Sequence, residues 1–258
     1  MKIQLLKKNE VVLDKSVLAK IDLADIYLTN EFHLETAKLN QLEMQKTPLR
    51  TEIINFILEK LNRKTNYLEI GVRHRYENFD LVNSDVKFSV DPGYESDIND
   101  VDFKMTSDEF FDGIKNNQFL DPDIRFDVIF IDGSHFADQV LKDINNSLEY
   151  LKADGMIVMH DCNPPTEFHA VENYDYQISP SRGLWNGTTW KAFFKMRKRS
   201  DISSCCIDTD WGVGIISKSK NLGKPSLVEN EFYEYQILHK NRKKSLNLVT
   251  YDEFQAFF

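Results

Sequence analysis

Apolar and polar positions follow two different spacings along most of this chain. Between residues 51 and 61 the apolar side chains recur every three or four positions and form one stripe of a predicted helix, namely Ile53, Ile54, Ile57, Leu58 and Leu61. Short apolar runs follow, each ending in polar residues, at 67–71, 86–91, 102–105, 126–132 and 155–160. Helical patterns at 107–114 and 137–151 separate the last three of these runs. This alternation predicts right-handed βαβ units and a mostly parallel sheet.

The later part of the chain completes the predicted sheet. The nearly continuous apolar runs at 128–131 and 156–159 suit central strands that are buried on both faces. After a helix predicted at 188–199, two strands at 203–207 and 212–217 are joined by a tight turn, so one of them must run against the others. The predicted fold class is α/β, a Rossmann-like three-layer sandwich whose mostly parallel sheet has one antiparallel strand near its C-terminal end.

The length of 258 residues fits one elaborated domain better than two independent ones. Residues 1–50 have apolar positions at helical spacing and no strand-like run, which predicts a helical N-terminal extension. We expect the main domain at 51–220 and a C-terminal extension, packed on the same domain, at 221–258. The irregular stretch from residue 161 to about 187 is longer than an ordinary connection and is predicted to form a lid or pocket loop.

Composition and charge narrow the possible partners. The formal net charge of −9 disfavours nucleic acid and anionic membranes. The three cysteines, Cys162, Cys205 and Cys206, are odd in number and include an adjacent pair, so they predict a reducing cytoplasm and no disulfide framework. The apolar run at residues 3–6 is too short for a signal peptide or a membrane span.

Polar residues follow the predicted strands at the points where the strands end. The carboxyl ends of parallel strands meet at one edge of a sheet, which is where such folds bind ligands. Gly71 has no Cβ and allows the backbone to approach a ligand, and Asp91 is placed to accept hydrogen bonds from the hydroxyls of a ribose. The alternatives are a simple strand-to-helix turn at Gly71 and a turn aspartate at Asp91. The single glycine at the first turn disfavours a nicotinamide dinucleotide.

Five segments together resemble class I S-adenosylmethionine-dependent methyltransferases over residues 50–217: YLEIGV at 67–72, SVD at 89–91, MTSDEFF at 105–111, FIDGSH at 130–135 and IVMHD at 157–161. The resemblance implies that the first strand's acid and glycine approach the methionine part of the cofactor, that the second strand's acid holds the ribose, and that the residues after the third strand border the adenine. The implied cofactor residues are Glu69, Gly71, Arg73, Asp91, Met105, Thr106, Ser107, Asp132 and Gly133. Arg73 stands where the family often has a further glycine.

The second half of the site resembles a narrower group, the metal-dependent O-methyltransferases that act on sugars of natural products, and related glycan-cluster methyltransferases. This resemblance implies a divalent cation on Asp132, His160 and Asp161, with His135 as catalytic base beside Asp132. His160 stands where a carboxylate is usual, and an imidazole shifts the preference from Mg²⁺ toward Mn²⁺, Fe²⁺ or Zn²⁺. A hydrogen-bonded structural pair is the alternative for His160 and Asp161.

The acceptor pocket is expected over the cleft, in the segments 163–169 and 181–190. The candidate substrate residues combine flat apolar faces with hydrogen-bonding groups, a mixture that suits a sugar ring: Asn163, Glu167, Trp185, Asn186 and Trp190. The alternative for both tryptophans is packing in the core or at the start of a helix.

The resemblance implies an enzyme that transfers a methyl group from S-adenosylmethionine to a hydroxyl of a sugar or other small molecule. Three rivals remain open: an iron-dependent hydroxylase on the same fold, a nicotinamide-dependent dehydrogenase, and a non-catalytic nucleoside-binding module. The expected partners are a small-molecule or glycan acceptor and no nucleic acid, with a homodimer left open.

Overall fold

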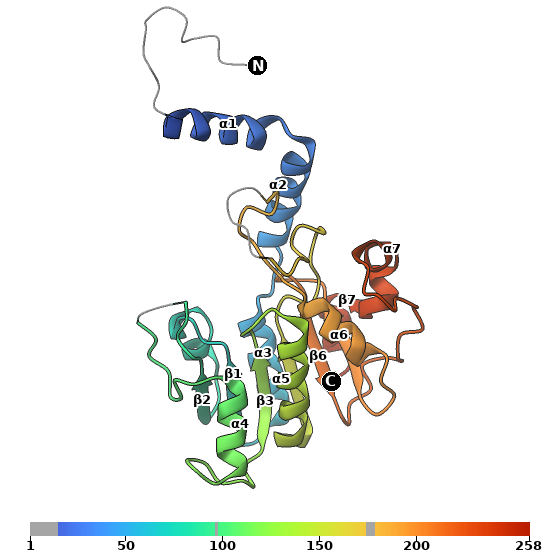
Figure 1. Ribbon diagram of the computed structural model, residues 1–258. Helices are drawn as coiled ribbons and strands as arrows, with labels where there is room; N and C mark the ends of the chain where they lie inside the picture. Colours follow the sequence, from blue (N-terminus) through green and yellow to red (C-terminus); the bar gives the residue numbers. More distant parts are fainter. Residues whose placement is uncertain (1–14, 96–97, 174–178) are drawn as a thin grey trace, which may run out of the picture.

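The computed structural model describes residues 15–95, 98–173 and 179–258. Its centre is a seven-stranded sheet with the strand order β2-β1-β3-β4-β6-β5-β7 and helices on both faces (Figure 1). The strands are β1 (Asn66–Ile70), β2 (Val86–Val90), β3 (Phe126–Ile131), β4 (Leu151–Met159), β5 (Ser203–Ile207), β6 (Val213–Ser217) and β7 (Leu248–Val249).

The strand directions confirm the predicted fold class. Strands β2, β1, β3 and β4 pair in parallel, whereas β6 runs antiparallel to both β4 and β5, and β7 is parallel to β5. Strand β6 is therefore the one that runs against the others among the described strands. The parallel half brings the carboxyl ends of four strands to one edge, as a ligand site requires.

The strand predicted at 102–105 is wrong. The structure has only a single parallel bridge between Val90 and Phe103 at this place. The carboxylate of Asp102 accepts hydrogen bonds from the backbone N–H and the hydroxyl of Ser89, at 2.9 and 2.8 Å. The Asp102 side chain therefore accepts the hydrogen bond of the Ser89 backbone N–H that the backbone of a neighbouring strand would otherwise accept. The pairing with β2 accordingly stops after one bridge.

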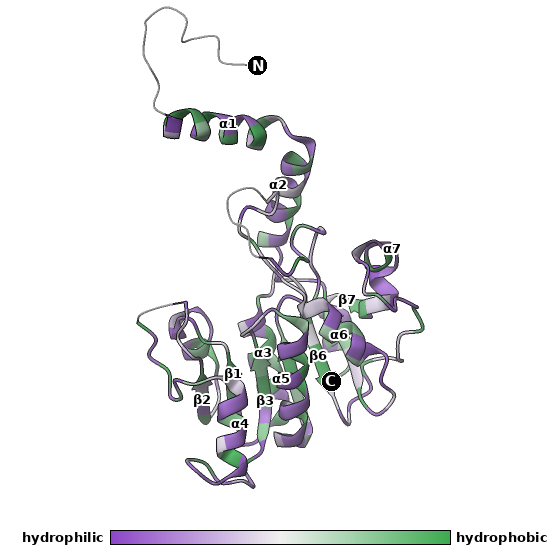
Figure 2. Ribbon diagram, viewed as in Figure 1, coloured by the Kyte–Doolittle hydropathy of each residue, from purple (hydrophilic) through white to green (hydrophobic). Residues whose placement is uncertain are grey.

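Two hydrophobic clusters show why the sheet is covered on both faces. In β3 all six residues are buried: Ile129 and Ile131 point into the cluster on one face, and Val128 and Phe130 into the cluster on the other. Hydrophobic residues accordingly concentrate in the central strands and on the sheet-facing sides of the helices (Figure 2). The three-layer arrangement follows from this double burial.

The main helices match the predicted stripes. The helix α3 (Arg50–Leu61) packs on one face of the sheet, and α4 (Ser107–Lys115), α5 (Ala137–Tyr150) and α6 (Thr189–Arg197) contribute to the cluster on the opposite face. Two short 3₁₀ helices, η2 (Arg75–Glu77) and η3 (Phe79–Leu81), connect β1 to β2. Among the described residues, no helix is both long and apolar enough to span a membrane.

The flanking segments take different positions. The helices α1 (Lys15–Thr29) and α2 (Glu31–Met44) project away from the sheet (Figure 1), and α1 has no buried residue. The first 14 residues of the predicted N-terminal extension lie outside the described residues. At the other end, α7 (Tyr235–Leu246) leads into β7, and α8 (Tyr251–Gln255) buries Phe254 in the cluster under α3.

Candidate active site

A cavity of 720 Å³ opens at the carboxyl ends of β1, β2, β3 and β4. Most of the predicted site residues line it: Glu69, Gly71, Arg73, Asp91, Thr106, Ser107, Asp132, Gly133, His135, His160, Asp161, Trp185 and Asn186. The structure therefore brings together side chains that are up to 117 positions apart in the sequence, as between Glu69 and Asn186.

At Gly71 the loop after β1 contacts the loop after β3. Its φ is 88°, in the left-handed region that favours glycine. A Cβ at this position would lie 2.3 Å from the carbonyl oxygen of Asp132 and from the Cα of Gly133. The loop after β1 can lie against the loop after β3 only because residue 71 has no side chain.

Glu69 lines the floor of the cavity and is only 3% exposed. Its Oε2 accepts hydrogen bonds from the Tyr67 hydroxyl at 2.5 Å and from the Asn78 amide at 2.8 Å. Burial raises the pKa of Glu69 to about 7, although both hydrogen bonds oppose the rise. Glu69 thus fixes the shape of the first turn from below, while its backbone leads directly to Gly71.

Asp91 lies at the end of β2 with its Oδ1 held in a turn. This oxygen accepts hydrogen bonds from the backbone N–H of Gly93 at 2.6 Å and from the Asn99 amide at 3.0 Å. The same Asn99 amide donates to the carbonyl oxygen of Val72. Asp91 is therefore a turn aspartate that also lines the cavity, and the contact with a ribose stays a prediction.

Of the three residues predicted after the missing third strand, two line the cavity and one does not. Met105 packs against the hydrophobic core and is not among the residues that line the cavity. Thr106 caps the N-terminus of α4, where its hydroxyl accepts a hydrogen bond from the Glu109 backbone. Ser107 is buried and points toward α5, where it bonds Asp143.

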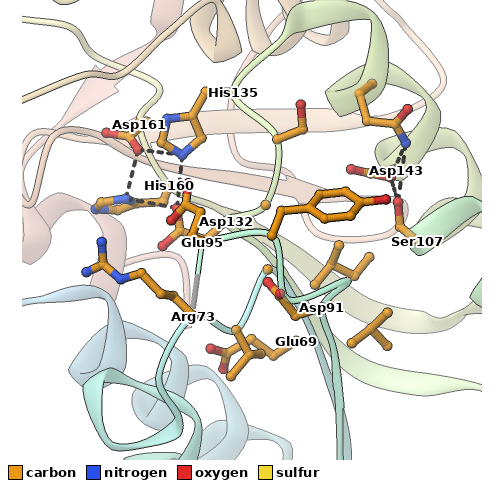
Figure 3. A pocket seen from close by; sticks show the side chains of 18 of the residues that line it. Glu69, Arg73, Asp91, Glu95, Ser107, Asp132, His135, Asp143, His160 and Asp161 are labelled. Carbon is orange, nitrogen blue, oxygen red and sulfur yellow. Dashed lines mark hydrogen bonds and ion pairs between the residues drawn. The ribbon is translucent and has the colours of Figure 1, made fainter. Parts of the chain in front are cut away.

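His135 and two carboxylates form the centre of the site (Figure 3). The His135 Nε2 lies 3.6 Å from Asp132 Oδ1 and 3.3 Å from Asp161 Oδ2, while its Nδ1 lies 3.0 Å from the Trp185 carbonyl oxygen. The carbonyl can only accept, so Nδ1 carries a proton and donates it. Burial would lower the pKa of His135, but Asp161 and Asp132 outweigh burial and raise it to about 9.

His160 is held between four charged groups. Its Nδ1 lies 3.1 Å from Asp161 Oδ2 and 3.3 Å from Asp132 Oδ1, and its Nε2 lies 3.3 Å from both Asp210 Oδ1 and Arg50 Nη1. Burial would lower the pKa of His160, but Asp161 and Asp132 raise it well above its ordinary value. Asp132 has a lowered pKa, since His160 and Arg50 outweigh the effect of burial.

The donor atoms suit a divalent cation, with a different set from the one expected. Side-chain atoms of Asp132, His135 and Asp161 all lie within 4.8 Å of one another, and two carboxylates with one imidazole suit Mn²⁺. The predicted ligand His160 has its Nδ1 3.3 Å from Asp132 Oδ1 and 3.1 Å from Asp161 Oδ2, the same two carboxylates that His135 faces, so its role as a ligand stays a prediction. A histidine that ligates a cation through Nε2 cannot accept a proton on that atom, so the roles of ligand and base exclude each other at His135.

Asp161 and Asn186 are positioned by local backbone and side-chain contacts. Asp161 has a φ of 60°, which is uncommon outside glycine and often marks a functional turn. The Asn186 amide donates to Asp161 Oδ1 at 2.7 Å, so Oδ2 is turned toward the two histidines. Asn186 is 1% exposed and its own Oδ1 has no hydrogen-bond partner among the described residues.

The predicted acceptor residues do not all reach the cavity. Trp185 lines it, with its ring centroid 5.1 Å from that of His135. Trp190 is 1% exposed and packs in the core, as the alternative interpretation held. Asn163 is buried against Arg242, and Glu167 is exposed; neither is among the lining residues.

Among the charged or polar side chains in or around this cavity that were not predicted from the sequence are Arg50, Gln139, Asp143 and Asp210. Arg50 opens α3, where the helical pattern gave no sign that its side chain reaches the strand ends. Asp210 lies in the turn between β5 and β6, with a φ of 45°. A cluster of two aspartates in a turn, DTD at 208–210, was the signal that could have indicated it.

Several known proteins with solved structures are similar to this chain. No match to a curated protein was found. Among solved structures, the chain is similar to an O-methyltransferase from Bacillus cereus in complex with S-adenosylhomocysteine, at 14% identity over 76% of this chain and 95% of that one, with a TM-score of 0.42. It is also similar to TomG from Streptomyces achromogenes, an O-methyltransferase of tomaymycin synthesis in complex with S-adenosylmethionine, at 11% identity over 80% and 99%, with a TM-score of 0.41.

A third similar structure is the MycE methyltransferase of the mycinamycin pathway in complex with Mg, S-adenosylhomocysteine and mycinamycin VI, at 14% identity over 90% of this chain and 68% of that one, with a TM-score of 0.42. A family model also matches the amino-acid sequence itself. The match covers residues 51–162, which contain Gly71, Asp91, Asp132, His135 and Asp161. The family model that residues 51–162 match is described as a methyltransferase domain.

Proposed function

We propose that this protein is an S-adenosylmethionine-dependent O-methyltransferase that acts on a hydroxyl of a sugar or another small molecule. One observation carries the proposal: within the segment that matches the methyltransferase model, the Nε2 of His135 lies between Asp132 and Asp161 in the wall of the same cavity that Gly71 and Asp91 line. The proposed nucleoside contacts and the proposed base therefore belong to one cavity.

The bound cofactor would supply an electrophilic methyl group on a sulfonium, so the protein has mainly to align the acceptor and exclude water. Gly71 lines the cavity at the strand ends, where the cofactor would lie. Asp91, at the end of β2, would accept hydrogen bonds from the ribose hydroxyls. Arg73 is half exposed at the mouth of the cavity, where its positive charge suits the carboxylate of the methionine part.

His135 would take the proton of the acceptor hydroxyl. Its Nδ1–H is directed at the Trp185 carbonyl oxygen, which leaves Nε2 facing the cavity between the two carboxylates. Those carboxylates stabilise the imidazolium that forms, as an oriented acid does in other general-base pairs. His135 must first lose the proton that Asp132 and Asp161 hold on it, which is the step a bound cation would favour.

A divalent cation would be held by Asp132 and Asp161, with His135 as a third ligand in the state where it does not act as base. A cation at this place would lower the pKa of the acceptor hydroxyl. We place methyl transfer ahead of iron-dependent hydroxylation because residues 51–162, which contain this cluster, match a methyltransferase model.

The acceptor would lie against Trp185, whose ring is beside His135. Flat aromatic faces pack against the apolar faces of sugar rings and other small molecules. Asn186 adds a buried carbonyl oxygen that lacks a partner among the described residues, which suits an acceptor hydroxyl as donor. Trp190, Asn163 and Glu167 have no role in this proposal.

Calorimetry with S-adenosylhomocysteine, with and without Mn²⁺, tests cofactor and metal separately. We expect binding by the wild type and at least a tenfold loss of affinity in Asp91→Ala, the cost of about 1.4 kcal/mol per tenfold. No binding in either condition would refute the proposed function. Titration of Mn²⁺ alone into wild type and Asp161→Asn tests the cation: equal heats in both proteins would remove the metal and leave methyl transfer.

The chain organisation remains part of the proposal, with residues 1–50 and 221–258 as extensions of one catalytic domain at 51–220. The pairing of β7 with β5 and the burial of Phe254 under α3 support the C-terminal part. A reducing, cytoplasmic location is proposed for the same chain, since Cys162, Cys205 and Cys206 are all free and buried.

A homodimer is proposed through the two projecting helices. Along α1 and α2 many large apolar side chains are exposed, namely Val17, Leu18, Ile26, Leu28, Phe32, Leu34, Leu42 and Met44. Exposed apolar patches of this kind mark interaction surfaces. Light scattering of the purified protein tests the proposal: a monomer at micromolar concentration would exclude a stable dimer.

A further inference from the structure

The helix α2 buries polar side chains and exposes apolar ones. Its buried residues recur every three or four positions and are all polar: His33, Thr36, Asn40 and Glu43. The large apolar side chains of the same helix are exposed instead: Phe32, Leu34, Leu42 and Met44. A surface helix normally buries its apolar stripe, so this reversed pattern indicates that specific polar contacts hold α2 in place.

These contacts lead to the segment that carries the proposed acceptor residues. We call residues 163–173 and 179–187 the acceptor loop. The residues of this loop that line the cavity are Gly183, Leu184, Trp185 and Asn186. One end of α2 lies beside the loop (Figure 1), where Phe32 also packs edge-to-face on Phe168 with ring centroids 5.9 Å apart.

Asn40 joins the two halves of the acceptor loop. Its amide nitrogen donates to the carbonyl oxygen of Ser181 at 3.3 Å, and its Oδ1 lies 2.8 Å from His169 Nε2. A backbone carbonyl only accepts hydrogen bonds, so the amide nitrogen faces Ser181 and the amide oxygen faces His169. His169 Nε2 therefore carries a proton and donates it to Asn40.

The His169 ring is held on both of its nitrogens. The side chain is fully buried, and burial lowers its pKa to about 4, so the ring is neutral at pH 7. A neutral imidazole has one donor and one acceptor. Because Nε2 donates to Asn40, Nδ1 accepts from the Thr166 hydroxyl at 2.8 Å. The ring thus links α2 to the first half of the acceptor loop.

The backbone of His169 extends this connection to the centre of the site. Its carbonyl oxygen accepts hydrogen bonds from the backbone N–H of Asn186 at 3.1 Å and of Gly187 at 3.0 Å. The Asn186 side chain in turn donates to Asp161 Oδ1 at 2.7 Å. A continuous series of contacts therefore runs from Asn40 through His169 and Asn186 to Asp161.

We propose that Asn40 is a positioning residue of the acceptor site, which fixes the acceptor loop through His169 so that Asn186 stays bonded to Asp161. The helix α2 is thus part of the active site and not only a surface for a second copy of the chain. The inference rests on the proposed function in one respect, because the proposed function makes this loop the place where the acceptor binds.

The competing interpretation is that α2 only connects α1 to the rest of the chain. Its polar contacts would then add to the free energy of unfolding without a particular effect on the acceptor loop. The two interpretations differ in whether loss of the Asn40 amide loosens this loop alone or the whole fold.

The experiment is hydrogen exchange of individual backbone amides, measured by NMR on wild type, Asn40→Leu and the control Gln41→Leu. Leucine has the branched shape of asparagine without its hydrogen-bonding atoms, and Gln41 is the exposed neighbour on α2. In Asn40→Leu the amides of Asn186 and Gly187 should exchange at least roughly tenfold faster, because their common acceptor is no longer fixed. Gln41→Leu should keep the wild-type rates.

The amide of Asp132 is the internal reference, since it donates to the Ile70 carbonyl oxygen at 2.9 Å where β1 ends. Its exchange rate should be the same in wild type and Asn40→Leu. Equal acceleration at Asp132 and Asn186 would show a general loss of stability and would overturn the inference. Unchanged rates at Asn186 and Gly187 would overturn it as well. If Asn40→Leu does not fold, Asn40→Ala replaces it with the same expected rates.

The conservative variant Asn40→Asp should restore the loop. Aspartate keeps an oxygen that accepts from His169 Nε2 but lacks the nitrogen that donates to Ser181. The exchange rates of Asn186 and Gly187 should therefore return to within about threefold of wild type. Rates as fast as those of Asn40→Leu would show that the contact with His169 does not hold the loop, against the inference.

Calorimetry with S-adenosylhomocysteine separates this inference from the proposed function. Asn40 is not among the residues that line the cavity, so the affinity of Asn40→Leu should stay within about twofold of wild type. A larger loss would show that α2 acts on the whole cavity and would overturn the assignment to the acceptor loop. A wild type that does not bind the compound would refute the proposed function, while the exchange rates would still decide whether Asn40 positions the loop.

Discussion

Two aspartates at opposite ends of β3 have different surroundings. Asp127, near the start of the strand, is fully buried, and four donors satisfy it: Arg63 Nε and Nη2 at 3.0 and 2.7 Å, Lys152 Nζ at 2.6 Å and the Asn66 backbone N–H at 2.7 Å. It is not among the residues that line the cavity. A buried carboxylate with this many short bonds stabilises one structure.

Asp132, directly after the same strand, lies in the wall of the cavity and has looser contacts. His160, His135 and Arg50 face it at 3.3, 3.6 and 3.8 Å. These distances exceed those of ordinary charge-assisted hydrogen bonds, which are about 2.7–2.9 Å. The start of β3 is therefore closed by its partners, whereas its end keeps charged atoms available to a ligand.

Loss of the proposed base should have the largest effect. We expect His135→Ala to lower kcat by about 10²–10⁴-fold, the usual contribution of a general base, while S-adenosylhomocysteine still binds. Turnover with an accepted substrate and calorimetry measure the two quantities. His239→Ala, an exposed histidine on α7, is the matched control. Wild-type turnover in His135→Ala would remove the base from the proposal.

At the closed end, Asp127→Ala should destabilise without affecting the chemistry. Removal of the carboxylate leaves the charges of Arg63 and Lys152 without their buried partner, which we expect to lower the free energy of unfolding by about 3 kcal/mol. Urea denaturation measures the loss. The kcat per folded molecule should stay unchanged, and a lower kcat would contradict the division between the two ends of β3.

The buried carboxyl in the floor of the cavity predicts a pH dependence of stability. The pKa of Glu69 is about 7 in the folded protein and about 4.5 in the unfolded chain, so the folded state holds its proton more tightly. Glu69 therefore contributes stability at low pH that is lost as the pH rises through this window, by about 2 kcal/mol between pH 5 and pH 7. Denaturation of wild type and Glu69→Gln at both values tests this, because the variant should lack that loss. Parallel curves would show that Glu69 is ionised when buried.

The smallest effect is expected at the exposed partner of Arg63. Asp154 accepts two hydrogen bonds from Arg63 but its side chain is 52% exposed, so solvent screens the pair. Asp154→Ala should cost below about 1 kcal/mol of unfolding free energy. The same denaturation assay compares it with Asp127→Ala, and equal losses would show that burial is not what makes Asp127 important.

Much of the candidate site could be predicted from the sequence, because the sequence shows where the strands end. Apolar runs located β1, β2, β3 and β4, and the polar residues after them, such as Asp91 and Asp132, reach one cavity because parallel strands end at a common edge. The predicted third strand failed because Asp102 bonds the backbone of Ser89, an interaction between a side chain and a neighbouring strand that periodicity does not contain.

The fold class, the edge where ligands can bind and most residues at that edge follow from the amino-acid sequence, because they depend on local periodicity and on the direction of parallel strands. The charges around His160, the position of Asp143 in the cavity wall and the burial of Trp190 in the core follow from tertiary packing. Those outcomes depend on how helices α3, α5 and α6 rotate about their axes as they pack. A single residue's direction is set by that packing and cannot be read from the spacing of its neighbours.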